Sequence, residues 1–418
     1  MGLDSCVKKY LREHVRNSIT YHPSPKDVYA SRDFCACIID LNVEFHRKPP
    51  HVTTGEAWIN YLYSARVNAT PGKVLVLVVD NPSRVPEVKD LCHLARAGAK
   101  RKRSFIPLPP DTKITDGPLP EWAALSGSRH LMPKIWEYLL RGIKARISND
   151  ASFDKTVYFD TCYSSQIKSP FLSGRILKVT SFGGDGVNAP PVPEHKYGEG
   201  DLKTRAWVIH CLKLRKSPDD GILIMSVDLD NIPIFAHTKF ENVCLMSNTV
   251  SRDAHGLVVP KSKGVESAYE IINLGRIATQ LAVNTDAFRV LLCLTKNDFN
   301  ENLHCLTTDR CLKTFFAMIS HGTKRLNAEK LLTDPKYYLC FVRMCTSKIY
   351  GNRAMKIPLC PRKKIEAFLS RGEWIFQYWS GKQQRSGGPD CRVSGGWVVP
   401  TKKMDLKEYS GKVRLIPA

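Results

Sequence analysis

An α/β fold with a mostly parallel sheet is the architecture that the sequence predicts, and two observations lead to it. First, short apolar runs have the length and β-branched content of strands that are buried on both faces of a sheet. Second, helical patterns separate these runs, which is typical of parallel strands joined by crossover helices. The expected strands are FCACIID (34–40), KVLVLVVD (73–80), TVYF (156–159), GILIMSVD (221–228) and RVLLCL (289–294).

The helical patterns also divide the chain. The expected helices between the strands include KDLCHLARAGAKRKR (89–103), PKIWEYLLRGIKARI (133–147) and DLKTRAWVIHCLKL (201–214). Five parts follow: the first half of an α/β core (1–80), a basic helical insertion (81–150), the second half of the core (151–300), a helical region (301–360) and a basic C-terminal extension (361–418).

Charge and composition narrow the class of protein. The chain has 418 residues, of which 62 are Lys or Arg and 40 are Asp or Glu, so its formal net charge is +22. A hydrophobic share of 43% is enough for a packed core and excludes a wholly disordered or fibrous chain. The positive surplus favours a polyanionic partner. Because no run of 18 apolar residues occurs and the polar N-terminus does not resemble a signal peptide, we expect an intracellular protein that binds nucleic acid rather than a membrane.

The 14 cysteines are scattered, and most of them lie in apolar runs. We therefore expect buried, reduced thiols, which is the usual role of cysteine in a core. The alternative is a metal site that uses His304, Cys305 and Cys311.

Acidic residues follow the expected strands. One aspartate after a strand is commonly a helix N-cap or a turn residue, but here several strands end this way and an E-x-D pair opens a later helix. The carboxyl ends of parallel strands meet at one edge of the sheet, so these acids are expected to converge there. They are Asp40, Asp80, Glu199, Asp201, Asp228, Asp230 and Asp298.

Such a concentration of like charge implies bound cations. Ligands that are all oxygen suit Mg²⁺, or Mn²⁺ as a substitute, rather than Zn²⁺. An acidic metal cluster in a strongly basic chain is what two-metal hydrolysis of phosphodiesters requires, because two ions activate water while basic residues hold the backbone.

The order of these acids resembles a known family. The chain starts MGL, and CIIDLN, VVDNPSRVPEVK, YGEGDLK, SVDLDN and LLCLTKNDF follow in that order. Together they resemble the motifs of the XPG/FEN superfamily of structure-specific 5′ nucleases, which includes flap endonuclease. The resemblance implies a PIN-like fold, a helical arch over residues 81–150, and two Mg²⁺ ions held by the seven acids named above.

The resemblance also assigns roles to basic residues. Lys89 and Arg96 fall where the family places two cations that contact the scissile phosphate. The run Lys100, Arg101, Lys102 and Arg103 extends this nucleic-acid-binding face and is also a candidate nuclear localisation signal. Trp122, Trp136 and Tyr138 are expected either to stack on unpaired bases or to belong to the core.

The expected function is hydrolysis of DNA at 5′ flaps or at junctions of single strand and duplex, in replication, repair or recombination, by a monomer. A nuclear location is favoured, with a cytoplasmic viral replication site as the other option. The residues after Asp298 lack the paired glycines of the family's helix-two-turn-helix, and Asp201 stands where the family has a second glutamate. Such departures are typical of divergent viral members, and they leave RNA as an alternative substrate. A third hypothesis is a nucleic-acid-binding factor that lacks catalysis.

Overall fold

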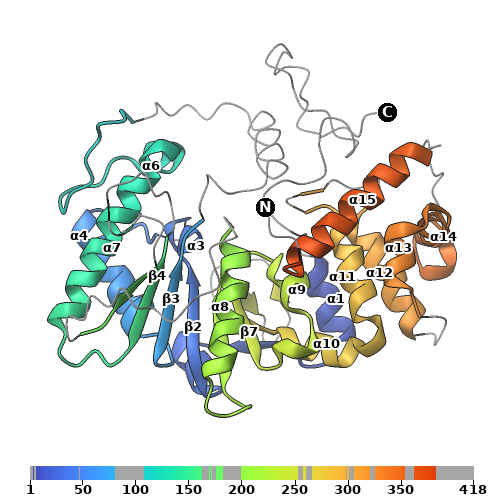
Figure 1. The fold of residues 1–418 in the computed structure, drawn as a ribbon, viewed down its shortest axis with the longest axis horizontal. Coiled ribbons are helices and arrows are strands. Elements are labelled where there is room, and N and C mark those ends of the chain that lie inside the picture. The colour runs from blue at the N-terminus through green and yellow to red at the C-terminus, as the bar shows by residue number, and fades with distance from the viewer. Residues whose placement is uncertain are drawn as a thin grey trace.

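Nine strands form one sheet in the described part of the chain (Figure 1). The computed structural model describes residues 3, 6–46, 48–80, 108–161, 169, 171, 176–181, 199–252, 258–259, 266–297, 299–300, 306–320, 325–353 and 362–382. The strand order is β1-β9-β7-β6-β2-β3-β4-β5, and β8 pairs with β7. The strands are β1 (Ile19–His22), β2 (Phe34–Asp40), β3 (Val74–Val78), β4 (Thr156–Asp160), β5 (Leu177–Val179), β6 (Gly221–Met225), β7 (Val243–Arg252), β8 (Val258–Val259) and β9 (Glu266–Asn273).

The centre of the sheet is parallel and its margins are antiparallel. Strands β7, β6, β2, β3 and β4 run in the same direction, whereas β1, β5, β8 and β9 pair in the antiparallel sense. The predicted α/β class with a mostly parallel sheet is therefore confirmed. Four predicted strands are present, but β3 and β6 end two and three residues before Asp80 and Asp228.

The strand predicted at 289–294 is wrong, because residues Thr285–Cys293 form helix α11. Both Phe288 and Leu292 are buried, and so are the residues between them, so the helix shows no polar face. A short apolar run of this kind does not distinguish a buried strand from a buried helix. Because the helix is buried on nearly all sides, the sequence lacks the alternation of apolar and polar residues that would have indicated a helix.

Helices cover both faces of the sheet. The helices that pack on one face are α3 (Leu41–His46), α4 (Gly55–Leu62) and α7 (Met132–Asn149). On the other side, α1 (Cys6–His14), α8 (Gly200–Leu214) and α10 (Leu274–Leu281) contact the strands. Further helices share the same core and pack on these helices and on one another, namely α9 (Asn231–Phe235), α11, α12 (Thr308–Ser320), α13 (Ala328–Thr333), α14 (Pro335–Cys345) and α15 (Arg362–Trp379). Shorter helices are α2 (Pro25–Ala30) and α6 (Trp122–Gly127), with a π-helical turn at Tyr63–Asn68 after α4.

The central strands are buried on both faces. In β2, Ala36 and Ile38 belong to the core under α8, while Cys37 and Ile39 belong to the core under α4 and α7. Successive side chains of a strand point to opposite faces, so a strand between two helical layers must be apolar throughout. This requirement explains why the strand runs were visible in the sequence.

The connections reverse direction beside β2. The chain passes from β2 to β3 and on to β4 through α3, α4 and α7, which lie on one face, and then returns to β6 through α8 on the other face. Strand order therefore switches between β2 and β6. In open α/β sheets, such a switch leaves a crevice at the carboxyl ends of the strands, where ligands bind.

Part of the predicted insertion belongs to this scaffold. Residues 81–107 lie outside the described residues, but α7 packs on the sheet, and its Trp136 is only 1% exposed. Trp122 packs against the rings of Phe45 and Trp58, and the hydroxyl of Tyr138 donates to Asp116. For these aromatic residues the structure favours a packing role.

The C-terminal third of the chain is helical where the structure describes it. Helices α12, α13 and α14 lie in the expected helical region 301–360, and the described part of the C-terminal extension contains α15. The described cysteines are free thiols, and most of them are buried, as the sequence predicts. Cys311 is one of these buried thiols, whereas His304 and Cys305 lie outside the described residues.

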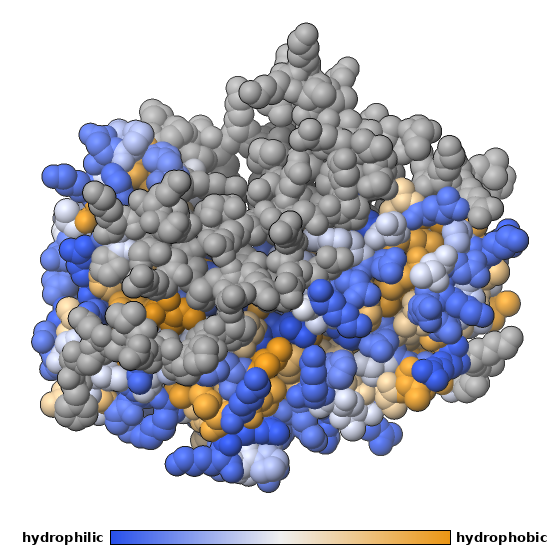
Figure 2. All heavy atoms as spheres, viewed as in Figure 1, coloured by the Kyte–Doolittle hydropathy of each residue, from blue (hydrophilic) through white to orange (hydrophobic). Residues whose placement is uncertain are grey.

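Polar side chains dominate the described surface on the face shown in Figure 2. Large apolar side chains that are well exposed are limited, among the described residues, to Leu214, Val283 and Ile349. None of the helices that the structure describes combines the length and the apolar character that a membrane crossing requires.

Candidate metal centre

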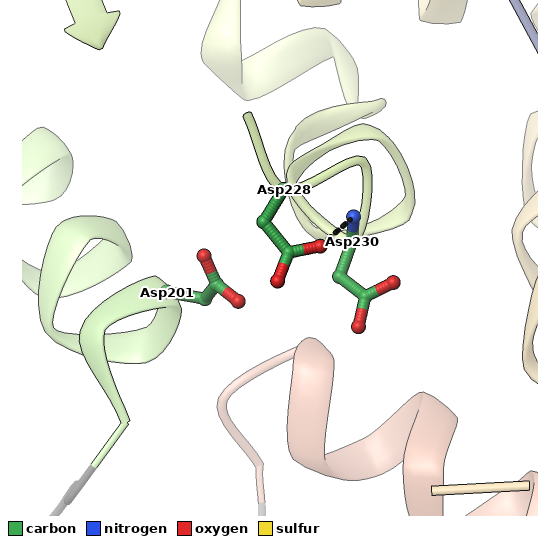
Figure 3. Close-up of side chains that lie close together, drawn as sticks. All are labelled: Asp201, Asp228 and Asp230. Carbon is green, nitrogen blue, oxygen red and sulfur yellow. Dashed lines mark hydrogen bonds between the residues drawn. The ribbon is translucent and has the colours of Figure 1, made fainter. Parts of the chain in front are cut away.

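Three aspartates form a compact cluster beside the strand switch (Figure 3). Asp201 lies in the first turn of α8, whereas Asp228 and Asp230 lie in the loop between β6 and α9. Each of the three can present a carboxylate oxygen such that the oxygens lie within 4.8 Å of one another. Figure 3 shows their carboxylates directed toward a common space from these two elements. The cluster could hold a metal ion, because its donors are oxygen atoms that converge from separate elements.

The loop that carries Asp228 and Asp230 is fixed by hydrogen bonds within itself. The amide of Asp230 donates to Oδ1 of Asp228 at 3.0 Å, and the amide of Asp228 donates to Oγ of Ser226 at 3.2 Å. Asn231 spans the two halves of the cluster, since its Nδ2 donates both to Oδ1 of Asp201 at 3.1 Å and to the carbonyl of Asp228 at 2.9 Å. These contacts orient the carboxylates before any ligand arrives.

The N-terminal segment also reaches the cluster. The backbone amide of Leu3 donates to Oδ1 of Asp230 at 3.0 Å, although 227 residues separate them in the sequence. Asp230 is 1% exposed, so this amide supplies a donor that water does not.

Asp40 lies on the other side of the switch, as the last residue of β2. Its Oδ1 accepts from the amides of Asn42 and Val43 at the start of α3, so it acts as an N-terminal cap, and its Oδ2 accepts from Ser226 Oγ at 3.3 Å. Burial and the nearby carboxylates of Asp80 and Asp228 raise the pKa of Asp40 to about 7. The carboxylates are therefore close enough to destabilise one another's charge.

Asp80 and Glu199 connect the strand end to α8. Oδ1 of Asp80 accepts a hydrogen bond from the amide of Gly200, the first residue of the helix. A Cβ atom at position 200 would lie 2.9 Å from the same oxygen, so a larger residue there would require the Asp80 carboxylate to shift. Glu199 occupies the N-cap position and is 1% exposed.

An ion pair beside the cluster was not predicted from the sequence. Asp160 ends β4, and its carboxylate contacts Lys203 Nζ at 3.2 Å and accepts from Trp207 Nε1 at 2.8 Å. Lys203 also donates to the carbonyl of Val79 at 2.7 Å, and its side chain is 2% exposed. One lysine thus ties α8 to the ends of β3 and β4, immediately behind the acids.

A sequence signal for this pair existed. TVYF is followed by Asp160, as the other strands are followed by acids, and Lys203 is two residues after Asp201 in a helix that was predicted correctly. Ser226 and Asn231, which flank the D-x-D pair, gave no such signal, because small polar residues next to a strand end are common in turns.

The predicted acids fall into two groups. The described ones all lie at the carboxyl ends of the central strands or at the start of α8, and they are Asp40, Asp80, Glu199, Asp201, Asp228 and Asp230. The remaining predicted site residues lie outside the described residues, and they are Lys89, Arg96, Lys100, Arg101, Lys102, Arg103 and Asp298. Because α11 is a helix, Asp298 follows a helix in the chain rather than the predicted strand.

The donor set fits a hard divalent cation. It contains only carboxylate oxygens, and Mg²⁺ and Mn²⁺ prefer oxygen ligands. Burial first, and then the neighbouring carboxylates of Asp80 and Asp228, raise the pKa of Asp40, and a bound cation would favour its ionised form.

No family model matches the chain, and no curated protein is significantly similar to it.

Mg²⁺ or Mn²⁺ should stabilise the folded chain through this cluster. We expect the free energy of unfolding to rise by about 2.7 kcal/mol when the free ion is about 100 times its Kd. Thermal unfolding with and without EDTA measures this change. Asp228→Asn keeps the oxygen that accepts from Asp230 but removes a charge, so it should lose most of the metal response.

The same variant should be more stable than the wild type in EDTA, because one of the repelling charges is gone. Asp219→Asn, which changes an exposed acid in the loop before β6, serves as the matched control and should respond to metal as the wild type does. An undiminished metal response in Asp228→Asn would contradict the assignment.

Removing Lys203 should destabilise the fold strongly. Lys203→Ala leaves the buried carboxylate of Asp160 without its cation, and we expect a loss of about 3–5 kcal/mol in urea unfolding. The double variant Lys203→Met with Asp160→Asn should recover most of this loss, since the amide oxygen can still accept from Trp207. Lys213→Met, at the exposed end of the same helix, should change stability by less than about 0.5 kcal/mol. Equal losses in both lysine variants would show that the ion pair contributes nothing specific.

Proposed function

We propose that the chain is a metal-dependent 5′ nuclease with a PIN-like core of the XPG/FEN type, which hydrolyses DNA phosphodiester bonds at 5′ flaps and at junctions of single strand and duplex. One observation supports this most: acids from β2, the end of β3, the start of α8 and the β6–α9 loop gather at the strand switch of a chain with net charge +22. A site that binds cations and a surface that attracts polyanions are the two requirements of such an enzyme.

The residues divide the work as follows. Asp201, Asp228 and Asp230 would hold the metal, with Asp40, Asp80 and Glu199 beside them, and Asp298 is proposed as the seventh acid of the site. When bound, Mg²⁺ provides a Lewis acid for the phosphate and lowers the pKa of a bound water. Ser226 and Asn231 keep the carboxylates in place through the hydrogen bonds described above. Lys89 and Arg96 are proposed to contact the scissile phosphate, and Lys100, Arg101, Lys102 and Arg103 to guide the single strand.

The fold is compatible with this function. A parallel sheet with its acids on the two sides of a strand switch, and with helices on both faces, is what a PIN-like nuclease core requires. The proposed setting is DNA replication, repair or recombination, with a monomeric enzyme acting in the nucleus or at a cytoplasmic replication site.

Loss of one central carboxylate should abolish cleavage. We expect Asp228→Ala and Asp80→Ala to reduce cleavage of a labelled 5′-flap DNA in Mg²⁺ by at least about 1,000-fold, because metal ligands act as a unit. Binding of the same substrate in EDTA should remain largely intact. Asp219→Ala is the control and should cleave at the wild-type rate. Cleavage at the wild-type rate by either site variant would refute the site assignment.

RNA is the second candidate substrate. The GEGD sequence that carries Glu199 and Asp201 is similar to the GEGE of 5′–3′ exoribonucleases, and the active site would be the same. Matched DNA and RNA flaps, each incubated with Mg²⁺ and with EDTA, separate the two candidates. We expect faster cleavage of the DNA flap, and preferential cleavage of the RNA flap would transfer the proposal to RNA.

A binding factor without catalysis is the third candidate. Its signature would be the loss of metal-binding acids, yet the six predicted acids that the structure describes are brought to one edge of the sheet. The metal response described above therefore also tests this candidate, since a factor without a metal centre would show none.

A further inference from the structure

A group of cations lies next to the aspartate cluster, on elements that also carry the acids. Arg205 is four residues after Asp201 in α8, so the two share a helix face and lie about 6 Å apart along the axis. Arg289 comes from α11, and its Nε donates to the carbonyl of Pro233 at 2.7 Å, in the helix that begins just after Asp230.

The two arginines meet at the end of α15. Nη2 of Arg205 donates to the carbonyl of Ser380 at 2.6 Å, and Nη2 of Arg289 donates to the hydroxyl oxygen of the same residue at 3.0 Å. Arg205 is 8% exposed and Arg289 is 4% exposed, so both guanidinium groups are held inside the protein. Figure 3 shows the red-coloured end of this helix below the three aspartates.

Glycine permits this close approach. Gly381 has a φ of +70°, in the left-handed region, and a Cβ there would lie 2.1 Å from Nη1 of Arg205. The chain can therefore turn directly over the guanidinium group, and the turn brings Lys382 to the same place.

Exposed lysines complete the group. Lys239 Nζ lies 4.9 Å from the centre of the Phe240 ring, and Arg205 lies over the same ring at 5.9 Å. Partial burial, and then the cations Arg205, Arg289 and Lys382, lower the pKa of Lys239, as expected where like charges lie close together. The carboxylate of Asp286 accepts from Arg289 Nη1 at 3.1 Å. It balances one of the four cations of this group, and the other three are Arg205, Lys239 and Lys382.

We propose that Lys239, Ser380 and Lys382, positioned by the buried Arg205 and Arg289, form a phosphate-binding site that holds the nucleic-acid backbone beside the aspartate cluster. An anion would relieve the mutual repulsion of the cations, as a metal would relieve that of the acids. The Ser380 hydroxyl accepts from Arg289 and retains a proton that it can donate to a phosphate oxygen. The proposal rests on the proposed nuclease function, because it places a second phosphate of the same strand next to the one that is cleaved.

A purely structural role is the competing explanation, since the arginines also fasten α15 to the core. The exposed lysines distinguish the phosphate-binding role from the structural role, because they contribute charge without fastening α15. The double variant Lys239→Glu with Lys382→Glu should therefore unfold at the wild-type temperature while it loses nucleic-acid affinity.

The experiment is fluorescence anisotropy of a labelled 5′-flap DNA with the full chain in EDTA, over a series of salt concentrations. We expect the double variant to bind at least about tenfold more weakly, and the slope of log affinity against log salt to fall by about two, which corresponds to two lost phosphate contacts. Lys213→Glu with Lys216→Glu is the matched control. It makes the same change in net charge at the opposite end of α8, beyond the screening length, and should alter affinity by less than about twofold.

Each outcome decides the matter. Equal losses of DNA affinity in both double variants would mean that only general charge attraction is involved, and would overturn the proposal. Wild-type affinity in Lys239→Glu with Lys382→Glu would overturn it as well. Binding in EDTA does not depend on cleavage. If only the variant Lys239→Glu with Lys382→Glu loses affinity but the wild type cuts no flap, the phosphate site stands and the nuclease function is refuted. If the wild type binds no DNA, the phosphate site is refuted.

Discussion

Electrostatic repulsion among carboxylates at one edge of a parallel sheet is the constraint on which the arrangement of this protein depends. Asp40, Asp80 and Asp228 are held at the ends of neighbouring strands, and burial together with this proximity raises the pKa of Asp40. A group of close carboxylates lowers the stability of the fold, because each carboxylate would ionise more favourably if the others were farther away. The repulsion is tolerable when donors, cations or both are present, and much of the surrounding structure supplies donors.

The scaffold acts on these acids mainly through α8. The helix contributes Asp201 to the cluster, offers the amide of Gly200 to Asp80, and sends Lys203 to the ends of β3 and β4. Because α8 precedes β6 in the chain and packs on the face opposite to α4 and α7, it belongs to the connection that returns to the other side of β2. One helix thus takes part both in the strand switch and in the cluster of acids beside it.

The C-terminal helices help to gather positive charge next to these acids. Arg205 and Arg289 converge on Ser380, so a region far away in the sequence is fastened within one helical turn of an acid. Acidic and basic side chains are thus gathered in adjoining parts of the structure, with the acids at the strand ends and the cations around Ser380. The net charge of +22 conceals this separation, since it adds the two patches together.

The sequence by itself determined the class of fold, most of the parallel strands, and the identity of the acids. It could do so because strands buried on both faces must be apolar throughout, and because an acid after such a strand stands out against it. It failed at 289–294, where burial on every side removed the helical period from α11.

Only the tertiary structure decided which residues meet. Asp160 meets Lys203 and Trp207 only because α8 packs against the end of β4, and the approach of Leu3 to Asp230 joins parts of the chain that are 227 residues apart. The basic group around Ser380 likewise combines residues from α8, the loop after α9, α11 and the end of α15. Local sequence records propensity and burial, whereas partners of this kind are chosen by the order in which strands and helices pack, and that order is a property of the whole chain.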